Sequence, residues 1–446
     1  MRLSRRQFLR SAALVAGPMI LPSRILFGAN TPSNRVNLAL IGCGARGMAE
    51  GQIYTRSDIC QMVAVCDPRE DRRLAAQGRF NTMYARQRQS GTYKGCDAYN
   101  DFRDVLARPD VDAVYIATSD HWHVPITIAA AMAGNDMHTE KPLGVCIAQN
   151  FAARAAVRRY GSVFQYGTER RSTAHARHAI ELVLNGRIGK VHTIYVVSPG
   201  SIKGGSATPE LPVPKGFDYD LWLGPAPEAP FCHDRCLVSG PSNGIFHIYD
   251  YAIGFIAGWA AHPLDLVQWW ADHSGLTSPV SYEGTGTLPD SGLFDCITDW
   301  DMQCRYENGL LLRFMDNQTV EKYPNVPGLR GPNSATFVGE QGWVSVSYQD
   351  VMTQPARLMQ SDIGADEIHL QTSASHQLTW VECVRSRQDP VSTIESAVRS
   401  DIISHLSDIA VRTGRKIGWD PVKETIIGDE QATRMMTRAM RPPWAL

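Results

Sequence analysis

The sequence has no excess of charge of either sign. Its 446 residues include 44 Lys and Arg against 45 Asp and Glu, so the formal net charge is -1. Such a balance provides no overall positive field to hold a nucleic-acid backbone or an anionic membrane surface. Nucleic acid is therefore not an expected partner. With 43% hydrophobic and 20% charged residues the chain is expected to be globular, and its length of 446 residues predicts two or three domains.

Cysteine is scarce, and ten residues in so long a chain are too few for a disulfide scaffold. The repeated C-x-x-C spacing of a structural zinc site is missing as well. Cys232 and Cys236 form the closest pair and are an alternative place for a metal. Our prediction is that the protein holds no metal.

Long hydrophobic runs are also missing. The apolar stretch from Ala12 to Leu21 is too short to span the ~30 Å of a bilayer core. It follows Ser4 to Arg10, whose paired arginines precede Phe and Leu, and this combination predicts a twin-arginine export signal over residues 1–33. We expect cleavage near Ala29, export by the twin-arginine machinery to the periplasm or beyond, and no membrane anchor afterwards. The alternative is the basic N-terminus of a cytosolic protein.

A glycine-rich motif stands directly behind the first buried-strand pattern. Val36 to Ile41 is apolar and leads into Gly42-Cys43-Gly44-Ala45-Arg46-Gly47, after which the residues favour a helix. In G-x-G-x-x-G the first glycine permits a tight turn, the second lets the backbone approach a pyrophosphate, and the third allows close packing of helix on strand. The motif predicts a bound dinucleotide, with contacts from Gly42, Gly44, Ala45, Arg46 and Gly47.

An acidic residue lies at the end of the second apolar run. Met62 to Cys66 ends in Asp67, at the spacing from the motif where a carboxylate accepts hydrogen bonds from the adenosine ribose hydroxyls. A carboxylate there repels a 2′-phosphate, so NAD is predicted in preference to NADP. The nearby Arg69 is the feature that keeps NADP open.

Two further strand patterns end in polar residues that face the same crevice in an open parallel sheet. Ala113 to Ala117 is followed by Thr118 and by Asp120-His121-Trp122-His123, which we expect to form a wall against the cofactor. The alternative for His121 and His123 is metal ligation. Asp136 to Thr139 leads into Glu140-Lys141-Pro142. Cofactor contacts are predicted for Thr118, Asp120, His121, Trp122, His123, Glu140 and Lys141.

These motifs resemble the Gfo/Idh/MocA oxidoreductases, the relatives of glucose-fructose oxidoreductase and inositol dehydrogenase. Glu140-Lys141-Pro142 carries the resemblance most specifically, together with Trp222-Leu223-Gly224-Pro225. The likeness covers nearly the whole chain after the predicted signal. Its other parts are Gln165 to Arg171, Gly186 to Lys190, Asp218 to Leu221, Trp419 to Pro421 and Arg441 to Trp444.

The pattern changes from alternating strands and helices to separated strands after about Gly161. The fold predicted is α/β, with a Rossmann dinucleotide-binding domain over residues 34–160 and an α+β domain over residues 161–446. The resemblance implies that the second domain holds an open, mostly antiparallel sheet that covers the nicotinamide. Ser201 to Pro214 is expected to be a loop that overhangs the pocket or contacts another subunit of a homo-oligomer.

The rest of the active site is expected around His262. Gly258 to Trp270 opens with small residues and becomes a helix, so His262 and Asp265 share one face and can meet one sugar ring. The resemblance gives His262 a catalytic role in an Asp-x-Gly-x-His-x-x-Asp motif, in which Gly258 replaces the first Asp. The alternative is a structural histidine that supports the helix start.

The absence of an acid at Gly258 leaves two interpretations of the site open. Asp250, flanked by Tyr249 and Tyr251, fills the vacancy from a neighbouring loop, or ordinary dehydrogenase activity is lost. The predicted substrate contacts are Asp265, Tyr249, Asp250, Tyr251 and, from the stretch that joins the domains, Arg170.

Oxidation of a secondary alcohol by a nicotinamide needs a base for the hydroxyl proton. A partly dry pocket lowers the pKa of a lysine, so Lys141 is the predicted base and His262 its partner. The alternative for Lys141 is a phosphate or ribose contact without acid-base work. Since no NAD pool is expected outside the cytoplasm, we predict a sugar or glycoside oxidoreductase whose tightly bound cofactor is recycled internally. An NAD-dependent glycoside hydrolase and a non-catalytic sugar-binding protein with structural NAD are the alternatives.

Overall fold

The structure is a computed structural model that describes residues 35–238, 240–326 and 328–445. The predicted export signal, residues 1–33, lies outside the described residues. Across the described ranges, no helix combines the length and the apolar character needed to cross a bilayer.

Six parallel strands form the first sheet, in the order β3-β2-β1-β4-β5-β6. This is the strand order of dinucleotide-binding folds, whose ligands bind beyond the carboxyl ends of the strands where the order reverses. The reversal lies between β1 and β4, so the predicted Rossmann fold is confirmed. The strands are β1 (Val36–Ile41), β2 (Cys60–Cys66), β3 (Asp97–Tyr99), β4 (Ala113–Ile116), β5 (Asp136–Thr139) and β6 (Phe164–Tyr166).

Helices follow the strands in the alternation that parallel pairing requires. Because helices cover both faces of the sheet, β1, β2 and β4 read as nearly continuous apolar runs and are almost wholly buried. The helices of this half are α2 (Ala45–Tyr54), α3 (Glu70–Met83), α4 (Ala85–Gln89), α5 (Phe102–Leu106), α6 (Asp120–Met132) and α7 (Ile147–Tyr160).

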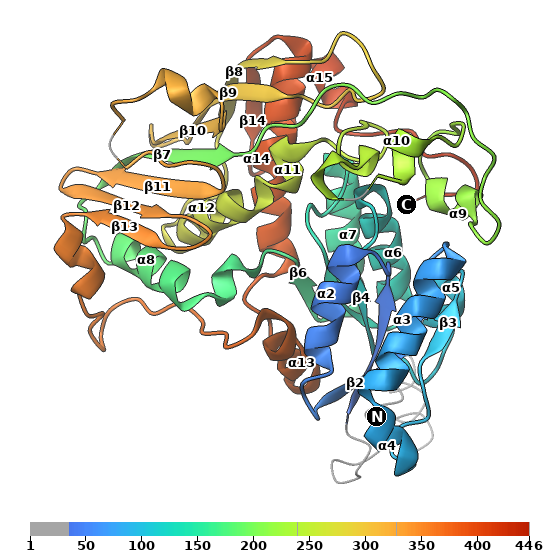
Figure 1. Ribbon diagram of the computed structural model, residues 1–446. Coiled ribbons are helices and arrows are strands. Elements are labelled where there is room, and N and C mark those ends of the chain that lie inside the picture. The colour runs from blue at the N-terminus through green and yellow to red at the C-terminus, as the bar shows by residue number, and fades with distance from the viewer. Residues whose placement is uncertain (1–34, 239, 327, 446) are drawn as a thin grey trace, which may run out of the picture. The chain divides into compact units, whose positions relative to one another are not determined.

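The first sheet extends beyond the boundary predicted at residue 160. β6 pairs in parallel with β5 and completes the sheet at Tyr166. A helix from far along the chain, α13 (His376–Ser386), also contacts α2 and β1 (Figure 1). The sequence pattern missed both, because β6 is only three residues long and because α13 reaches this half through tertiary contacts alone.

Nine strands form the second sheet, in the order β13-β12-β11-β7-β10-β9-β8-β14-β15. β7 and β10 pair in parallel, and the other neighbours pair antiparallel, which confirms the predicted mostly antiparallel sheet. The strands are β7 (Val191–Ser198), β8 (Ser281–Thr287), β9 (Asp299–Arg305), β10 (Leu311–Asp316), β11 (Ser334–Gly339), β12 (Gly342–Val346), β13 (Val351–Gln354), β14 (Ile417–Asp420) and β15 (Thr425–Ile427).

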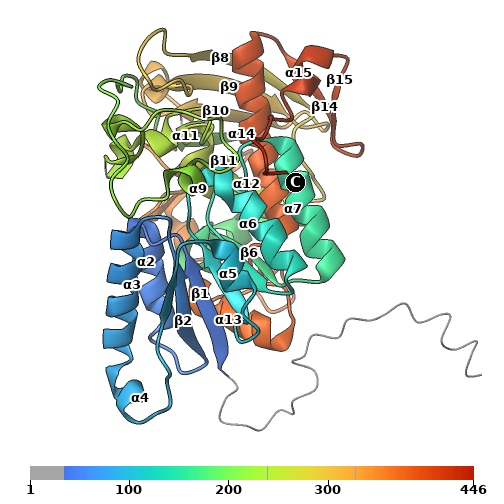
Figure 2. The same cartoon turned by 90° about the vertical axis from the view of Figure 1, so that its right-hand side faces the viewer.

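Helices α8, α12 and α14 pack against strands of the second sheet. α14 also contacts α7 of the Rossmann half, and Figure 2 shows the two helices side by side. Both halves therefore contribute to one hydrophobic core. The helices of this half are α8 (Ala174–Leu184), α9 (Tyr219–Leu223), α10 (His233–Cys236), α11 (Phe255–Gly258), α12 (Ala261–His273), α14 (Ile394–Thr413), α15 (Glu430–Arg434) and the 3-10 turns η2 (Glu169–Ser172), η3 (Gly240–Ser242), η4 (Gly244–Phe246), η5 (Thr319–Lys322) and η6 (Ala356–Gln360).

Candidate functional site

A cavity of about 450 Å³ lies at the carboxyl ends of β1, β2 and β4. Residues of η3 and η4 also line it, and so does Tyr348 in the turn after β12. The cavity brings together most of the predicted cofactor and catalytic residues. Those that line it are Gly42, Gly44, Ala45, Arg46, Asp67, Thr118, Asp120, Trp122, His123, Glu140, Lys141 and His262.

The three glycines of the motif have three different surroundings. Gly42 has a φ of +98°, and a Cβ there would lie 2.4 Å from the carbonyl oxygen of Ala117. At Gly47 a Cβ would lie 2.0 Å from the carbonyl oxygen of Gly42, so helix α2 approaches the loop only because Gly47 has no side chain. A Cβ on Gly44 would meet nothing nearer than the Arg72 guanidinium at 3.8 Å. Gly44 thus leaves open space at the N-terminus of α2, where a pyrophosphate fits.

Asp67 is buried at the end of β2 and is held in place by backbone donors. Its Oδ2 accepts from the amide of Cys43 at 2.9 Å, and its Oδ1 accepts from the amide of Arg69 at 2.9 Å. Burial raises the pKa of Asp67, and the nearby Arg72 opposes that rise. Arg72 also lines the cavity, whereas the side chain of Arg69 pairs with Asp71. The cation beside the predicted ribose site is therefore Arg72, which sequence reasoning missed.

The first turn of α6 places its residues in different environments. His123 contacts the carbonyl oxygens of Pro142 and Thr118 through its two ring nitrogens, at 2.7 and 3.2 Å, so it supports the loop that carries Lys141. His121 contacts the carbonyl oxygen of Trp222 at 3.1 Å and lies outside the cavity lining. Burial lowers the pKa of His121 to about 4. Among the described residues no group of three or more His, Cys, Asp or Glu is placed to hold a metal.

Trp122 connects the first turn of α6 to the Trp222–Pro225 motif. Its indole nitrogen donates to the carbonyl oxygens of Leu221 and Trp222 at 3.1 and 3.2 Å. Gly224 has a φ of +50°, and a Cβ there would lie 2.1 Å from the Trp122 ring. The glycine of Trp-Leu-Gly-Pro is thus required by close packing on Trp122. The indole ring of Trp444 completes this packing, with its centroid 4.7 Å from that of Trp122.

Lys141 is partly buried in the cavity wall. Its Nζ donates to the carbonyl oxygen of Gly258 at 2.6 Å and lies 5.1 Å from the ring centroid of Trp259. Burial lowers the pKa of Lys141, although the carboxylates of Glu140 and Asp120 oppose this. The environment thus favours the neutral amine, which is the form that accepts a proton.

The vacancy at Gly258 is not filled by Asp250. Asp250 is exposed and lies outside the cavity lining, so the structure does not support its predicted role. A Cβ on Gly258 would meet only the Phe255 ring at 3.7 Å, so room for a side chain remains. Asp120 is one of the carboxyl residues that line the cavity with Lys141, and burial raises the pKa of Asp120 to about 8 despite the lysine charge.

Arg46 of the glycine motif binds three carboxylates. Its guanidinium contacts Glu50 at 2.8 Å, Glu140 at 2.8 Å and Glu169 at 2.6 Å. Glu140 also accepts from the hydroxyl of Tyr115 at 2.8 Å. Arg46, from the glycine loop, therefore holds Glu140, the residue next to Lys141, in place. Arg46 lines the cavity and forms these ion pairs at the same time.

His262 lies at the start of α12 and lines the same cavity as Lys141. Burial, followed by the nearby Lys141 charge, lowers the pKa of His262 well below its usual value. Its Nδ1 is buried and has no hydrogen-bond partner among the described residues. The edges of Tyr348 and Trp259 confine the ring, at centroid distances of 5.6 and 6.1 Å. His262 is therefore a neutral imidazole whose Nδ1 can form a hydrogen bond that no described residue supplies.

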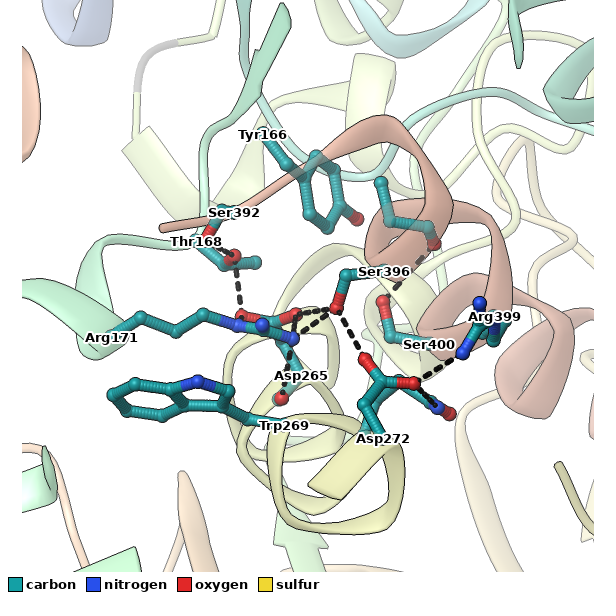
Figure 3. Close-up of polar contacts among 12 residues, drawn as sticks. Tyr166, Thr168, Arg171, Asp265, Trp269, Asp272, Ser392, Ser396, Arg399 and Ser400 are labelled. Atoms are coloured by element: carbon teal, nitrogen blue, oxygen red, sulfur yellow. Dashed lines mark hydrogen bonds and ion pairs between the residues drawn. The ribbon is translucent and has the colours of Figure 1, made fainter. Parts of the chain in front are cut away.

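Asp265 does not reach the cavity. It is fully buried and forms a two-pronged ion pair with Arg171, at 2.6 and 2.8 Å, and it also accepts from the hydroxyl of Thr168 at 2.7 Å (Figure 3). Figure 3 shows the Arg171 side chain lying over Trp269 with its guanidinium at Asp265, where Nε and Nη2 donate to the carboxylate. The predicted contact between Asp265 and a sugar is corrected, because Asp265 pairs with Arg171 instead. The three-residue spacing from His262 predicts the helix face of Asp265 but not the side chain that binds it.

The remaining predicted substrate contacts are engaged elsewhere. Tyr249 donates to Asp408 at 3.2 Å, and the Tyr251 hydroxyl accepts from Arg235 at 3.0 Å. Arg170 is buried, and its guanidinium donates to the carbonyl oxygens of Ser347 and Asn333. None of these side chains lines the cavity, so their predicted substrate contacts are corrected too. They hold loops around the site together.

Several cavity residues were missed from the sequence. Tyr348, Trp259 and Phe246 line the cavity, and the first two contact the His262 ring. Glu169 accepts a hydrogen bond from the Tyr348 hydroxyl. Trp259 was detectable, since it stands three residues before His262. Tyr348 gave no signal, because its strand turn reaches the cavity only through the tertiary structure.

The fold and the site together define a class, an oxidoreductase with an NAD-binding Rossmann fold. Residues 36–168 match the family described as "Oxidoreductase family, NAD-binding Rossmann fold", and residues 201–446 match its "C-terminal alpha/beta domain". The chain therefore belongs to the Gfo/Idh/MocA oxidoreductase family.

Relatives with curated names match parts of the chain. A "Glycosyl hydrolase family 109 protein" of Stenotrophomonas maltophilia is 25% identical over 49% of this chain and 47% of its own. A "Myo-inositol 2-dehydrogenase" of Thermotoga maritima is 27% identical over 36% of this chain and 45% of its own. The chain thus spans less than half the length of either relative.

Solved structures share the fold over most of the chain. The aldose-aldose oxidoreductase of Caulobacter crescentus has a TM-score of 0.57 at 18% identity, over 86% of this chain and 99% of its own. The WlbA dehydrogenase of Bordetella pertussis, in complex with NADH and UDP-GlcNAcA, has a TM-score of 0.57 at 17% identity, with the same coverage. At these identities the likeness concerns the fold alone.

Proposed function

We propose that this oxidoreductase acts on a hydroxyl of a sugar or glycoside and retains its nicotinamide cofactor through the catalytic cycle. One observation carries the proposal: Lys141 and His262 line the same cavity as the glycine loop and Asp67. The proton acceptor, the pyrophosphate cradle and the ribose site are therefore within one continuous space.

The residues present fit a dinucleotide. Gly42 and Gly47 permit the loop conformation, Gly44 leaves the helix N-terminus accessible, and Asp67 offers a preorganised carboxylate. Bound nicotinamide would accept a hydride from the substrate and return it. Asp67 favours NAD over NADP in this proposal, and Arg72 is the group that a 2′-phosphate would have to use.

Lys141 takes the hydroxyl proton in this scheme. Its lowered pKa makes the neutral amine available nearer to neutral pH, and its bond to the Gly258 carbonyl orients Nζ. His262 holds the same hydroxyl or its neighbour, because its neutral ring has a free buried nitrogen. Trp259 and Tyr348 offer aromatic faces to the apolar side of a sugar ring.

A second candidate is a glycoside hydrolase that oxidises, eliminates, hydrates and reduces its substrate in turn. The relatives named as glycosyl hydrolase family 109 proteins favour it. This route would use the same Lys141 and His262 and would need a further acid-base group.

The proposal also includes export of the protein and internal recycling of its cofactor. The paired arginines Arg5 and Arg6 support twin-arginine export to the periplasm. A homo-oligomer is supported by the loop over Ser201–Pro214, where Ile202, Leu211 and Val213 are exposed apolar side chains.

The test measures the first half-reaction, in which the substrate reduces the bound cofactor. Purified protein with its own cofactor is mixed with a panel of 4-nitrophenyl hexosides while absorbance is followed near 340 nm and near 400 nm. A rise near 340 nm shows hydride transfer, and release of nitrophenol shows the hydrolase route. Absence of both, with glycoside binding retained, would leave a non-catalytic sugar-binding protein.

A further inference from the structure

Tyr348 and Glu169 form a tyrosine–carboxylate pair at the cavity that the oxidation step does not use. Tyr348 lies in the turn between β12 and β13, its residue is 40% exposed, and its hydroxyl donates to Oε1 of Glu169. Its ring stands edge-on to His262 at a centroid distance of 5.6 Å. A proton-bearing oxygen is thus placed beside the predicted catalytic histidine.

The phenol is held from behind. The guanidinium of Arg170 lies 4.1 Å from the ring centroid of Tyr348 and is itself fixed by the carbonyl oxygens of Ser347 and Asn333. The buried Arg170 cation over the face of the Tyr348 ring restrains that ring. It does not cover the Tyr348 hydroxyl, which bonds to Glu169.

The charges around the pair suit transfer of a proton. Burial, followed by the Glu169 charge, raises the pKa of Tyr348, so the phenol keeps its proton. Burial alone would raise the pKa of Glu169, but the Arg46 charge and the hydrogen bond from Tyr348 hold it below its ordinary value. A protonated phenol therefore donates to an ionised carboxylate at neutral pH.

This pair is separate from Lys141. Lys141 contacts the ring of Trp259, Trp259 contacts His262, and His262 contacts Tyr348. His262 thus lies between two proton-handling groups that share one cavity. Removal of a hydroxyl proton during alcohol oxidation requires only one of them, which is Lys141.

We propose that Tyr348 is a second catalytic acid-base group, which relays protons to and from Glu169 and acts on the carbon beside the newly formed ketone of a glycoside. This inference rests on the oxidoreductase function proposed above and narrows its substrate to a glycoside.

The step balances without a further oxidant. Once the hydroxyl carbon has become a ketone, the neighbouring C–H bond breaks and its proton passes to the Tyr348 oxygen, while the Tyr348 proton passes to Glu169. The electron pair left on carbon forms a carbon–carbon double bond and expels the glycosidic oxygen. That oxygen takes the proton back through Tyr348. Water then adds across the double bond, with its hydroxyl on the carbon that carried the glycosidic oxygen and its proton on the neighbouring carbon. Return of the hydride, together with the proton that Lys141 took, restores the alcohol.

The test uses Tyr348→Phe and a matched control, Tyr323→Phe. Tyr323 donates to Asp301 at 2.6 Å, and Arg313 lies 4.1 Å from its ring centroid, so it repeats the arrangement away from the cavity. Both proteins are compared with wild type in heavy water with 4-nitrophenyl hexosides. Deuterium in the sugar is measured by mass spectrometry, and cofactor reduction by absorbance near 340 nm. Melting temperature and NAD affinity, from tryptophan fluorescence, are measured without substrate.

The expected result is a loss of deuterium uptake of at least ~100-fold in Tyr348→Phe, the scale on which acid-base groups act. The loss should exceed any loss in cofactor reduction by at least ~10-fold, and NAD affinity should stay the same. Glu169→Gln should reproduce it, whereas Tyr323→Phe should behave as wild type.

Three results would overturn the role of Tyr348. These are equal losses in both steps, deuterium uptake in Tyr348→Phe that matches Tyr323→Phe, and a wild type that reduces its cofactor but takes up no deuterium. A wild type that reduces no cofactor with any glycoside would instead contradict the oxidoreductase proposal itself, so the two failures are distinguishable.

Discussion

At the scale of single residues, the cavity changes what ordinary side chains do. Burial lowers the pKa of both Lys141 and His262, and it raises the pKa of Asp120 to about 8. All three groups are shifted toward their neutral forms, because a partly dry cavity disfavours charge. A neutral lysine beside a cofactor site is suited to accept a proton, and a neutral histidine is suited to hold the same hydroxyl by a hydrogen bond.

Replacing Lys141 or His262 with Ala should lower turnover by at least ~100-fold while the fold and the bound cofactor are kept. Because the base is the neutral amine, kcat/KM of the wild type should rise with pH. The midpoint should lie below the usual lysine value of about 10.4, as burial lowers the pKa of Lys141. Steady-state rates between pH 6 and pH 10 measure this. A variant with an unchanged rate removes that residue from the mechanism.

Replacing Asp67 with Ala should weaken NAD more than NADP. The carboxylate that binds a ribose diol also repels a 2′-phosphate, and its removal leaves Arg72 unopposed near the same place. Fluorescence titration with each cofactor measures the change, with Glu307→Ala as a control on an exposed carboxylate away from the cavity. Extraction of NADP from the native protein would contradict the assignment.

At the scale of elements, the sequence spacing predicts the contacts of the glycine loop but not those of helix α12. The loop does locally what its spacing predicts, because Gly47 packs on the backbone of Gly42, Gly42 packs on Ala117 at the end of the adjacent strand, and Gly44 leaves open space. In α12 the spacing correctly predicts a shared face for His262 and Asp265. The partner of Asp265 is nevertheless Arg171, from a segment distant in sequence.

The glycines should separate into two classes on substitution. Gly47→Ala should destabilise the protein, since its Cβ would lie 2.0 Å from the Gly42 carbonyl oxygen, whereas Gly44→Ala meets open space and should fold normally. Gly44→Ala should still bind NAD less tightly, because its methyl group would stand where the pyrophosphate approaches. Thermal unfolding and NAD titration distinguish the two. Normal NAD affinity in a folded Gly44→Ala protein would be evidence against a pyrophosphate at this loop.

Asp265→Ala should act on stability before it acts on sugar binding. Removing one partner of a buried ion pair leaves an unpaired charge and costs about 3–5 kcal/mol. Urea unfolding should show this loss, while Asp250→Ala, which changes an exposed carboxylate, should unfold like wild type. A stable Asp265→Ala protein with a raised KM for glycosides would restore the predicted substrate contact.

At the scale of the whole molecule, the site depends on both halves of the chain. The Rossmann half supplies the glycine loop, Asp67 and Lys141, and the second half supplies His262 and Tyr348. Neither half alone holds both the cofactor cradle and the full set of acid-base candidates.

Protein purified from the periplasm should already contain NAD and should complete catalytic cycles with none added. Folded protein crosses by the twin-arginine route, so a ligand bound inside can travel with it. Mass spectrometry of the denatured protein measures the cofactor. Arg5→Lys with Arg6→Lys should abolish export while the cytoplasmic protein keeps its NAD. A strict requirement for added NAD would contradict internal recycling.

The sequence alone determined the Rossmann half, the cofactor loop and the identity of Lys141 and His262 as cavity residues. These features depend on short-range backbone geometry and on the rule that strands of an open parallel sheet end at a common edge. Only the tertiary structure decided which acidic and aromatic residues of the second half share that cavity. Asp265 and Tyr249 were predicted at the substrate and are engaged by Arg171 and Asp408, whereas Tyr348 was not predicted and lines the cavity. The pairing of such side chains depends on packing between segments far apart in the chain, which local spacing does not encode.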